Sequence, residues 1–165
     1  MDMIAPLRRL KPVIDEEQRA EEQMRQKALP QGEAHLTAAL RLASDDYTGN
    51  VLMGKCLIAQ KRYLQAAPFL DRAKAVYPGE GQAIRLSGIN KLALRQPGAA
   101  LQEFDEYERR LPGNPGIIFL KGFAHENMQD RPGAAREYQR YLEAVQQGEQ
   151  ATYAAQRLRE WGYLK

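Results

Sequence analysis

The sequence predicts an all-α protein, a right-handed solenoid of antiparallel helix pairs with about nine helices. Glycines recur every 34 residues, at Gly54, Gly88 and Gly122. Each glycine is followed twelve residues later by an alanine and sixteen residues later by a large side chain; these are Ala66, Ala100 and Ala134, then Leu70, Phe104 and Tyr138. Because one short helix pair cannot bury its own apolar face, a period of this length indicates units that stack on their neighbours.

The three clear units each predict two helices. The first helices are expected at about 48–60, 82–95 and 116–129, and the second helices at about 63–77, 98–111 and 133–147. Pro97 and Pro132 fit at helix starts, where the missing N–H has no intrahelical partner, while Pro78 and Pro112 follow helix ends. Pro68 falls inside its helix and predicts a local bend or a later helix start.

Both ends of the chain depart from the clear pattern. Residues 1–12 form a short leader that contains two prolines, and residues 13–46 read as a degenerate first unit with Ala20 in the glycine slot. One period back from Leu70 and Ala73 lie Leu36 and Ala39. Residues 149–165 are expected to form a capping helix over the last unit, since a stack leaves an apolar edge at each end.

The spacing of glycine, alanine, bulky residue and proline resembles the tetratricopeptide repeat (TPR) family. In that register the units are 47–80, 81–114 and 115–148. The pattern departs from the family at its early tryptophan, which is replaced by Asn50, Ile84 and Ile118, and at the third closing proline, which is Gln146.

The resemblance implies a concave groove lined mainly by the first helices, where the family holds extended peptides. The positions carried over are Val51, Lys55, Ile58, Arg85, Ile89, Leu92, Phe119, Phe123 and Glu126. The lysine and asparagine slots of the carboxylate-clamp subclass hold Val51, Lys55 and Leu86, so that clamp is not expected. The groove suits a segment that inserts hydrophobic side chains and carries some acid. The alternative is that Ile89, Phe119 and Phe123 only pack against neighbouring helices.

We therefore expect a non-catalytic protein-interaction scaffold of bacterial type that needs no cofactor and binds a protein or peptide partner. A second hypothesis rests on residues 141–163, which resemble the helical-repeat tails of bacterial cell-envelope zinc metalloproteases. As an accessory domain of such a protease, the chain would position substrate or gate access. A third alternative is a homodimer formed through the exposed apolar groove or the leader.

The composition and the motifs bear on three further questions: nucleic-acid binding, location, and metal or catalytic sites. The net charge of +3 comes from scattered basic residues, which does not favour nucleic-acid binding. No apolar run is long enough for a membrane span or a signal peptide, so we expect a cytoplasmic protein, or a periplasmic one if the chain is a fragment of a secreted precursor. With one cysteine and two histidines, no zinc site is expected, and no phosphate loop or nucleophile motif is present.

Overall fold

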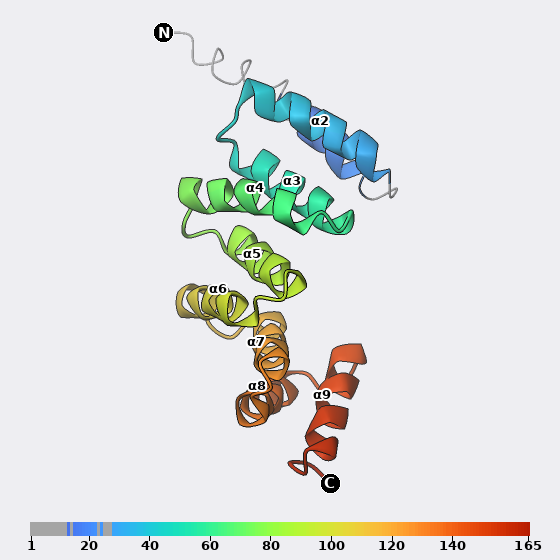
Figure 1. The fold of residues 1–165 in the computed structure, drawn as a ribbon, viewed down its shortest axis with the longest axis vertical. Helices are drawn as coiled ribbons and strands as arrows, with labels where there is room; N and C mark the ends of the chain where they lie inside the picture. Colours follow the sequence, from blue (N-terminus) through green and yellow to red (C-terminus); the bar gives the residue numbers. More distant parts are fainter. Residues whose placement is uncertain (1–12, 14, 23, 25–27) are drawn as a thin grey trace. The chain divides into compact units, whose positions relative to one another are not determined.

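The structure is a computed structural model that describes residues 13, 15–22, 24 and 28–165 (Figure 1). The expected leader, residues 1–12, lies outside the described residues. The described residues are helical or in turns, with no strand among them. Residues 15–22 are helical, and the helices that follow are α2 (Leu29–Leu42), α3 (Tyr47–Ala59), α4 (Tyr63–Val76), α5 (Gly81–Ala93), α6 (Pro97–Arg110), α7 (Pro115–Asn127), α8 (Arg131–Ala144) and α9 (Glu149–Glu160).

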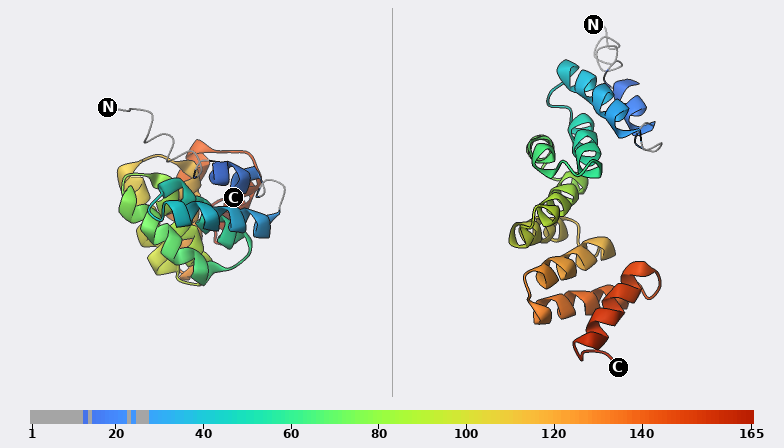
Figure 2. Two further views of the ribbon diagram at one scale, coloured as in Figure 1. Left: turned by 90° about the horizontal axis from the view of Figure 1, so that it is seen from above. Right: turned by 45° about the vertical axis from the view of Figure 1, so that its right-hand side comes forward.

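The chain divides into two compact units, Met1–Leu86 and Ser87–Lys165, with the boundary inside α5. In the first unit, α2 packs on α3 and α3 packs on α4. In the second unit, α7 packs between α6 and α8, and α9 packs on α8, as Figure 2 also shows. The two helices of each of these pairs follow one another in the sequence.

The first unit has one continuous core. Ala20, from the helical residues 15–22, and Leu36 of α2 are both fully buried in it, which explains why these segments keep small and apolar residues at those positions. Two core clusters lie in the second unit. One is built around Phe104 and Ile117, and the other joins Tyr138 on α8 to Leu158 on α9.

The three periodic glycines have equivalent surroundings. A Cβ on Gly54 would lie 2.4 Å from a Leu70 methyl carbon, and Cβ atoms on Gly88 and Gly122 would lie 2.3 and 2.5 Å from the rings of Phe104 and Tyr138. The three alanines that follow these glycines, Ala66, Ala100 and Ala134, are also fully buried. Small residues thus allow the two helices of each pair to approach closely, as the spacing predicted.

The turn inside each pair is also repeated. Lys61, Arg95 and Gln129, 34 residues apart, have φ values of 60°, 60° and 61°. In each turn the next residue donates its backbone N–H to a carbonyl five positions back, and these bonds are Arg62 to Leu57, Gln96 to Lys91 and Asp130 to His125. The left-handed residue closes the first helix and starts the reversal.

The helix bounds lie within one to three residues of the expected ones. The difference at Pro68 is informative, because α4 begins at Tyr63 and includes Pro68, so the later helix start was wrong. Polar caps fix other helix starts: Asp46 accepts from the N–H of Gly49 at α3, and Asn114 accepts from the N–H of Ile117 at α7.

Candidate functional site

In the first unit, one predicted groove residue is buried and the other three are at least partly exposed. Val51 is 3% exposed and belongs to the core, so it does not line an open surface. Lys55 and Ile58 on α3 are half-buried, and Arg85 on α5 is exposed. Within the part of the chain that the structure describes, the side chains of Lys55 and Arg85 make no hydrogen bond or ion pair. These two cations are therefore free to bind an anionic group.

In the second unit, Ile89 and Leu92 of α5 are half-buried. Both pack against the cluster of Ala100, Phe104 and Ile117. Their apolar area is thus partly used within the fold, which agrees with the packing alternative.

The predicted aromatic residues of α7 contact other helices. The ring of Phe119 lies 5.6 Å from Tyr138, 5.3 Å from Tyr141 and 6.0 Å from Tyr153, measured between centroids. Phe123 also approaches Tyr153, at 6.4 Å. Because Tyr153 belongs to α9, the last helix covers the face of α7 that was expected to hold a peptide.

Glu126 is the charged centre of this contact. Its carboxylate accepts hydrogen bonds from the hydroxyls of Tyr138 at 2.7 Å and Tyr153 at 2.8 Å, and from Nε of Arg157. Burial and the hydrogen bond to Glu126 raise the pKa of Tyr153 to about 12 and raise that of Tyr138 further. The carboxylate of Glu126 is thus engaged by Tyr138 on α8 and by Tyr153 and Arg157 on α9.

A hollow of about 460 Å³ lies beside this centre. It is lined by Glu126, Gln129, Arg131, Arg157 and Trp161. The guanidinium of Arg157 sits over the ring of Trp161 at 5.0 Å, and its Nη1 donates to Glu160 at 2.6 Å. Trp161 also stacks on Tyr138 of α8, with 6.2 Å between the ring centroids, so it packs as an anchor of α9. Tyr153 and Arg157 escaped the sequence-based site because they lie 27 and 31 residues from Glu126.

A buried lysine organises the charges between α6, α7 and α8. Lys121 Nζ lies 2.9 Å from Glu108, 3.0 Å from Asp105 and 3.5 Å from Glu137. Arg140 bridges Glu108 and Glu137 from the outer side. Although burial opposes ionisation, the hydrogen bonds from Arg140 and Lys121 hold the pKa of Glu108 below its usual value. These cations are neutralised inside the fold, unlike Lys55 and Arg85.

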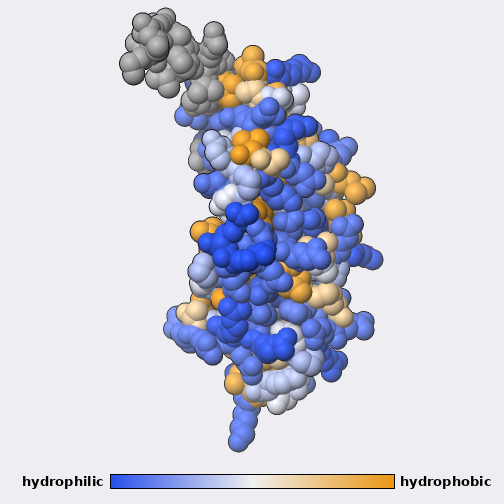
Figure 3. Space-filling view, turned by 90° about the vertical axis from the view of Figure 1, so that its left-hand side faces the viewer, coloured by the Kyte–Doolittle hydropathy of each residue, from blue (hydrophilic) through white to orange (hydrophobic). Residues whose placement is uncertain are grey.

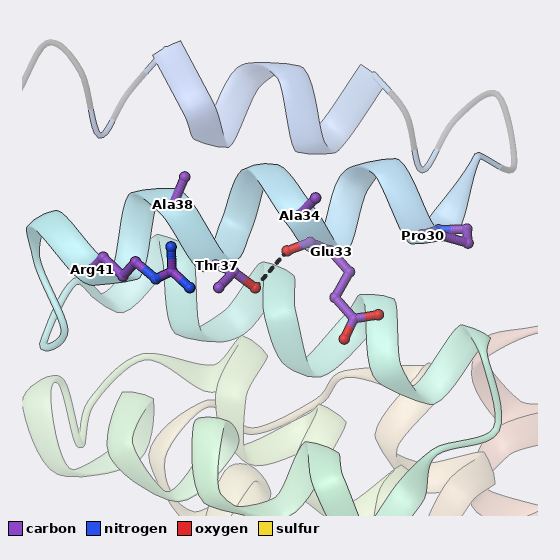
Figure 4. Close-up of a pocket in the computed structure, with 6 residues that line it drawn as sticks. All are labelled: Pro30, Glu33, Ala34, Thr37, Ala38 and Arg41. Carbon is purple, nitrogen blue, oxygen red and sulfur yellow. Dashed lines mark hydrogen bonds between the residues drawn. The ribbon is translucent and has the colours of Figure 1, made fainter.

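A second hollow, of about 410 Å³, runs along α2 in the first unit (Figure 4). All six residues that line it belong to α2: Pro30, Glu33, Ala34, Thr37, Ala38 and Arg41. Glu33 is already paired with Arg62 at 2.6 Å, and the hydroxyl of Thr37 donates to the carbonyl of Glu33. The polar groups of Glu33 and Thr37 in this depression are therefore already engaged within the fold.

The face of the molecule in Figure 3 is mostly hydrophilic, with apolar side chains in small separate groups. Among the described residues, no helix has the length and apolar character that a bilayer crossing requires. Three or more candidate ligands for a metal ion do not come together anywhere in the same set of residues. The histidines are engaged with carboxylates, His35 with Glu16 and His125 with Asp130, and Cys56 is a buried thiol whose pKa is raised by burial.

Helix pairs of this length, with a small residue at each crossing and a repeated turn, define the tetratricopeptide repeat fold. The chain thus has the predicted all-α repeat solenoid fold, and solved structures match it closely. MamA from Desulfovibrio magneticus RS-1 (residues 41 to the end) superposes with a TM-score of 0.82 at 14% identity, over 92% of this chain and 86% of that chain. YrrB, a TPR protein with an unusual peptide-binding site, gives a TM-score of 0.76 at 16% identity, over 83% and 71%.

A further crystal structure of MamA matches with a TM-score of 0.75 at 17% identity, over 79% of this chain and 72% of that chain. No family model matches the sequence, and no curated protein does. The weaker resemblance to metalloprotease tails finds no support in these comparisons.

Proposed function

We propose that this protein is a non-catalytic scaffold that binds a segment of a partner protein on the exposed face of its first helices. The observation that carries the proposal is the pair of free cations on successive first helices, Lys55 on α3 and Arg85 on α5. The basic side chains of Lys91, Lys121 and Arg157 in the second unit are all paired with carboxylates. The TPR fold, and the peptide-binding site of YrrB, support the same function.

The chemistry of the surface favours an acidic segment. Lys55 and Arg85 supply two positive charges, and the half-buried Ile58 supplies an apolar contact one turn from Lys55. An extended peptide with one hydrophobic side chain flanked by carboxylates satisfies both features. The candidate surface of the first unit is thus Lys55, Ile58 and Arg85, without the buried Val51.

The repeat boundaries are part of the proposal. Residues 47–80, 81–114 and 115–148 each form one repeat, with residues 13–46 as a degenerate N-terminal repeat and 149–165 as the capping segment. The repeated turns at Lys61, Arg95 and Gln129 support this division. We also propose that the scaffold acts in the cytoplasm. We further propose that it does not bind nucleic acid, since many of its basic residues are neutralised by neighbouring acids. A homodimer stays a prediction.

A charge-reversal experiment tests the surface. Binding of fluorescent peptides that carry one leucine between acidic residues is measured by anisotropy for the wild type and for Lys55→Glu/Arg85→Glu. We expect the double variant to bind at least tenfold more weakly, and the wild-type affinity to fall with salt because the contacts are exposed ion pairs.

The matched control reverses two exposed cations that do not belong to α3 or α5, Arg41→Glu/Arg136→Glu. It makes the same change in net charge and should keep the wild-type affinity within about twofold. Equal binding by both double variants would remove the proposed surface, because net charge alone would then explain any affinity for acidic peptides.

A further inference from the structure

Two acidic side chains meet at the start of α3. Glu17 comes from the helical residues 15–22, and Asp46 is the N-cap of α3, where it accepts a hydrogen bond from Gly49 N at 2.7 Å. A Cβ built on Gly49 would lie 3.2 Å from Oδ2 of Asp46 and 3.3 Å from Oε1 of Glu17. The two carboxyl groups therefore converge on one backbone position.

The burial of Glu17 makes this contact unusual. The residue is 9% exposed. Among the described residues, no N–H or O–H group donates a hydrogen bond to its Oε1 atom. Two ionised carboxylates at close range repel each other, and burying a carboxylate oxygen without a donor adds a desolvation cost. A hydrogen bond between two carboxyl groups requires one proton, and that proton removes both costs.

We propose that Glu17 and Asp46 share one proton and form a pH-sensitive clasp that fastens helical residues 15–22 to the start of α3. When the proton leaves to water, two adjacent negative charges remain and the helical residues detach. The clasp lies outside the peptide surface proposed above and does not depend on it. It would make the N-terminal edge of the first unit respond to pH.

The other charged groups around the clasp decide where it titrates. Glu21, on the same helical stretch, adds a further negative charge near Glu17, whereas the backbone N–H of Gly49 favours the ionised form. Glu16 does not compete, because it is bound by His35 of α2 at 2.7 Å and by Arg19 at 3.2 Å. Burial, followed by the contact with Asp46, raises the pKa of Glu17 to about 8.

The direction of the pH effect follows from this shift. A released Glu17 titrates near its ordinary value of 4.5, whereas the docked residue keeps its proton up to about pH 8. The docked state therefore binds one proton more between these values, and the docking constant falls about tenfold for each pH unit in this window. Release uncovers the apolar surface that Ala20 shares with Leu36 and Leu40.

Two measurements on the full chain test the clasp. The carboxyl ¹³C shift of Glu17 followed by NMR should titrate well above the ordinary range. Trypsin cleavage after Arg19, whose side chain is 62% exposed, reports detachment of the helical residues. Between pH 6.5 and 8, the cleavage rate relative to a free peptide with the same site should rise by at least about tenfold.

Variants separate the clasp from a general effect of pH. Glu17→Gln keeps a neutral donor toward Asp46, so cleavage should stay slow at every pH. Glu21→Gln, on the same helical stretch, should keep the wild-type rise. If Glu17→Gln docks poorly at all pH values, Asp46→Asn serves instead, because asparagine still caps α3 while the second charge is gone. The pKa of Glu17 should then fall, so the rise in cleavage should be smaller and should end at a lower pH than in the wild type.

A Glu17 midpoint within one unit of 4.5 would overturn the clasp, and so would a wild-type cleavage ratio that is independent of pH. Slow cleavage at pH 8.5 that appears only with added Ca²⁺ or Mg²⁺ would also overturn it, since a cation would then bridge the carboxylates. Peptide binding at Lys55 and Arg85 is unaffected by any of these results.

Discussion

At the scale of single residues, three glycines set how closely the helices of a pair can approach. The atoms that would meet an added Cβ belong to the large residue sixteen positions later in each repeat. The sequence could reveal this pairing because the two positions recur together. Overpacking a close crossing forces side chains off their rotamers or moves the backbone, which typically costs about 1–3 kcal/mol.

Gly54→Ala tests the crossing. We expect it to lower the free energy of unfolding by about 1–3 kcal/mol, because the new Cβ would overlap Leu70. Gly79→Ala is the control, since a Cβ there meets nothing within 4 Å. The midpoint of urea unfolding, followed by circular dichroism, measures both. Equal midpoints for the two variants would contradict the close approach.

Other residue-level features could not be predicted from the sequence. The left-handed turn residues are Lys61, Arg95 and Gln129, and none of them is the glycine or asparagine that usually marks such a position. The groove positions were less certain because a rotation of one residue about a helix axis exchanges buried and exposed faces. Val51 lies on the buried face of α3, whereas Lys55 on the same helix keeps a free side chain.

At the scale of helices, α9 is held by a polar centre as well as by apolar packing. Tyr153 and Arg157 both donate to Glu126 on α7, and Leu158 is buried in the cluster with Tyr138. A final helix was predicted within residues 149–165, and α9 spans Glu149–Glu160. The sequence could not show that it covers Phe119 and Phe123, because these contacts join residues some thirty positions apart.

Glu126→Ala tests the role of this centre. It removes the acceptor of two phenol hydroxyls and of Arg157 Nε, so we expect faster amide hydrogen exchange throughout α9. The pKa of Tyr153 should also fall from about 12 toward its ordinary value of 10, which absorbance at 295 nm can follow. Glu143→Ala, an exposed position on α8, should change neither quantity.

The raised pKa of Tyr153 also predicts how the stability of α9 changes with pH. A phenol whose pKa is raised in the fold contributes stability that is complete below pH 10 and is lost as the pH rises toward 12. Exchange in α9 of the wild type should therefore accelerate above pH 10, after correction for intrinsic rates. In Glu126→Ala this additional acceleration should be absent, and its persistence would contradict the proposed role of Glu126.

At the scale of the whole molecule, an all-α repeat fold follows from the period alone, and the solved structures of MamA and YrrB share it. The period was decisive because it combines several weak signals at fixed distances. Function depends on different information. The groove residues came from a family resemblance, and the contrast between the free charges of Lys55 and Arg85 and the paired charges of Lys91 and Lys121 became visible only in the structure.

A stack of helix pairs must also close its apolar ends. Leu158 is 1% exposed and anchors α9, so Leu158→Asp should detach this helix and expose the aromatic cluster around Tyr138. We expect self-association of the variant by light scattering after size-exclusion chromatography, and increased binding of an apolar dye. Gln156→Asp, on the exposed side of α9, should behave as the wild type. An unchanged mass for Leu158→Asp would argue against a capping role.

The identical reversals at Lys61, Arg95 and Gln129 also bear on how such a chain can change its length. A cut just after one reversal, joined just after the next, removes 34 residues and leaves an intact loop at the seam. Gene duplication or deletion can therefore add or remove a whole 34-residue unit while the loop at the join keeps the same conformation. Descendants of this chain are expected to differ in length by multiples of that unit.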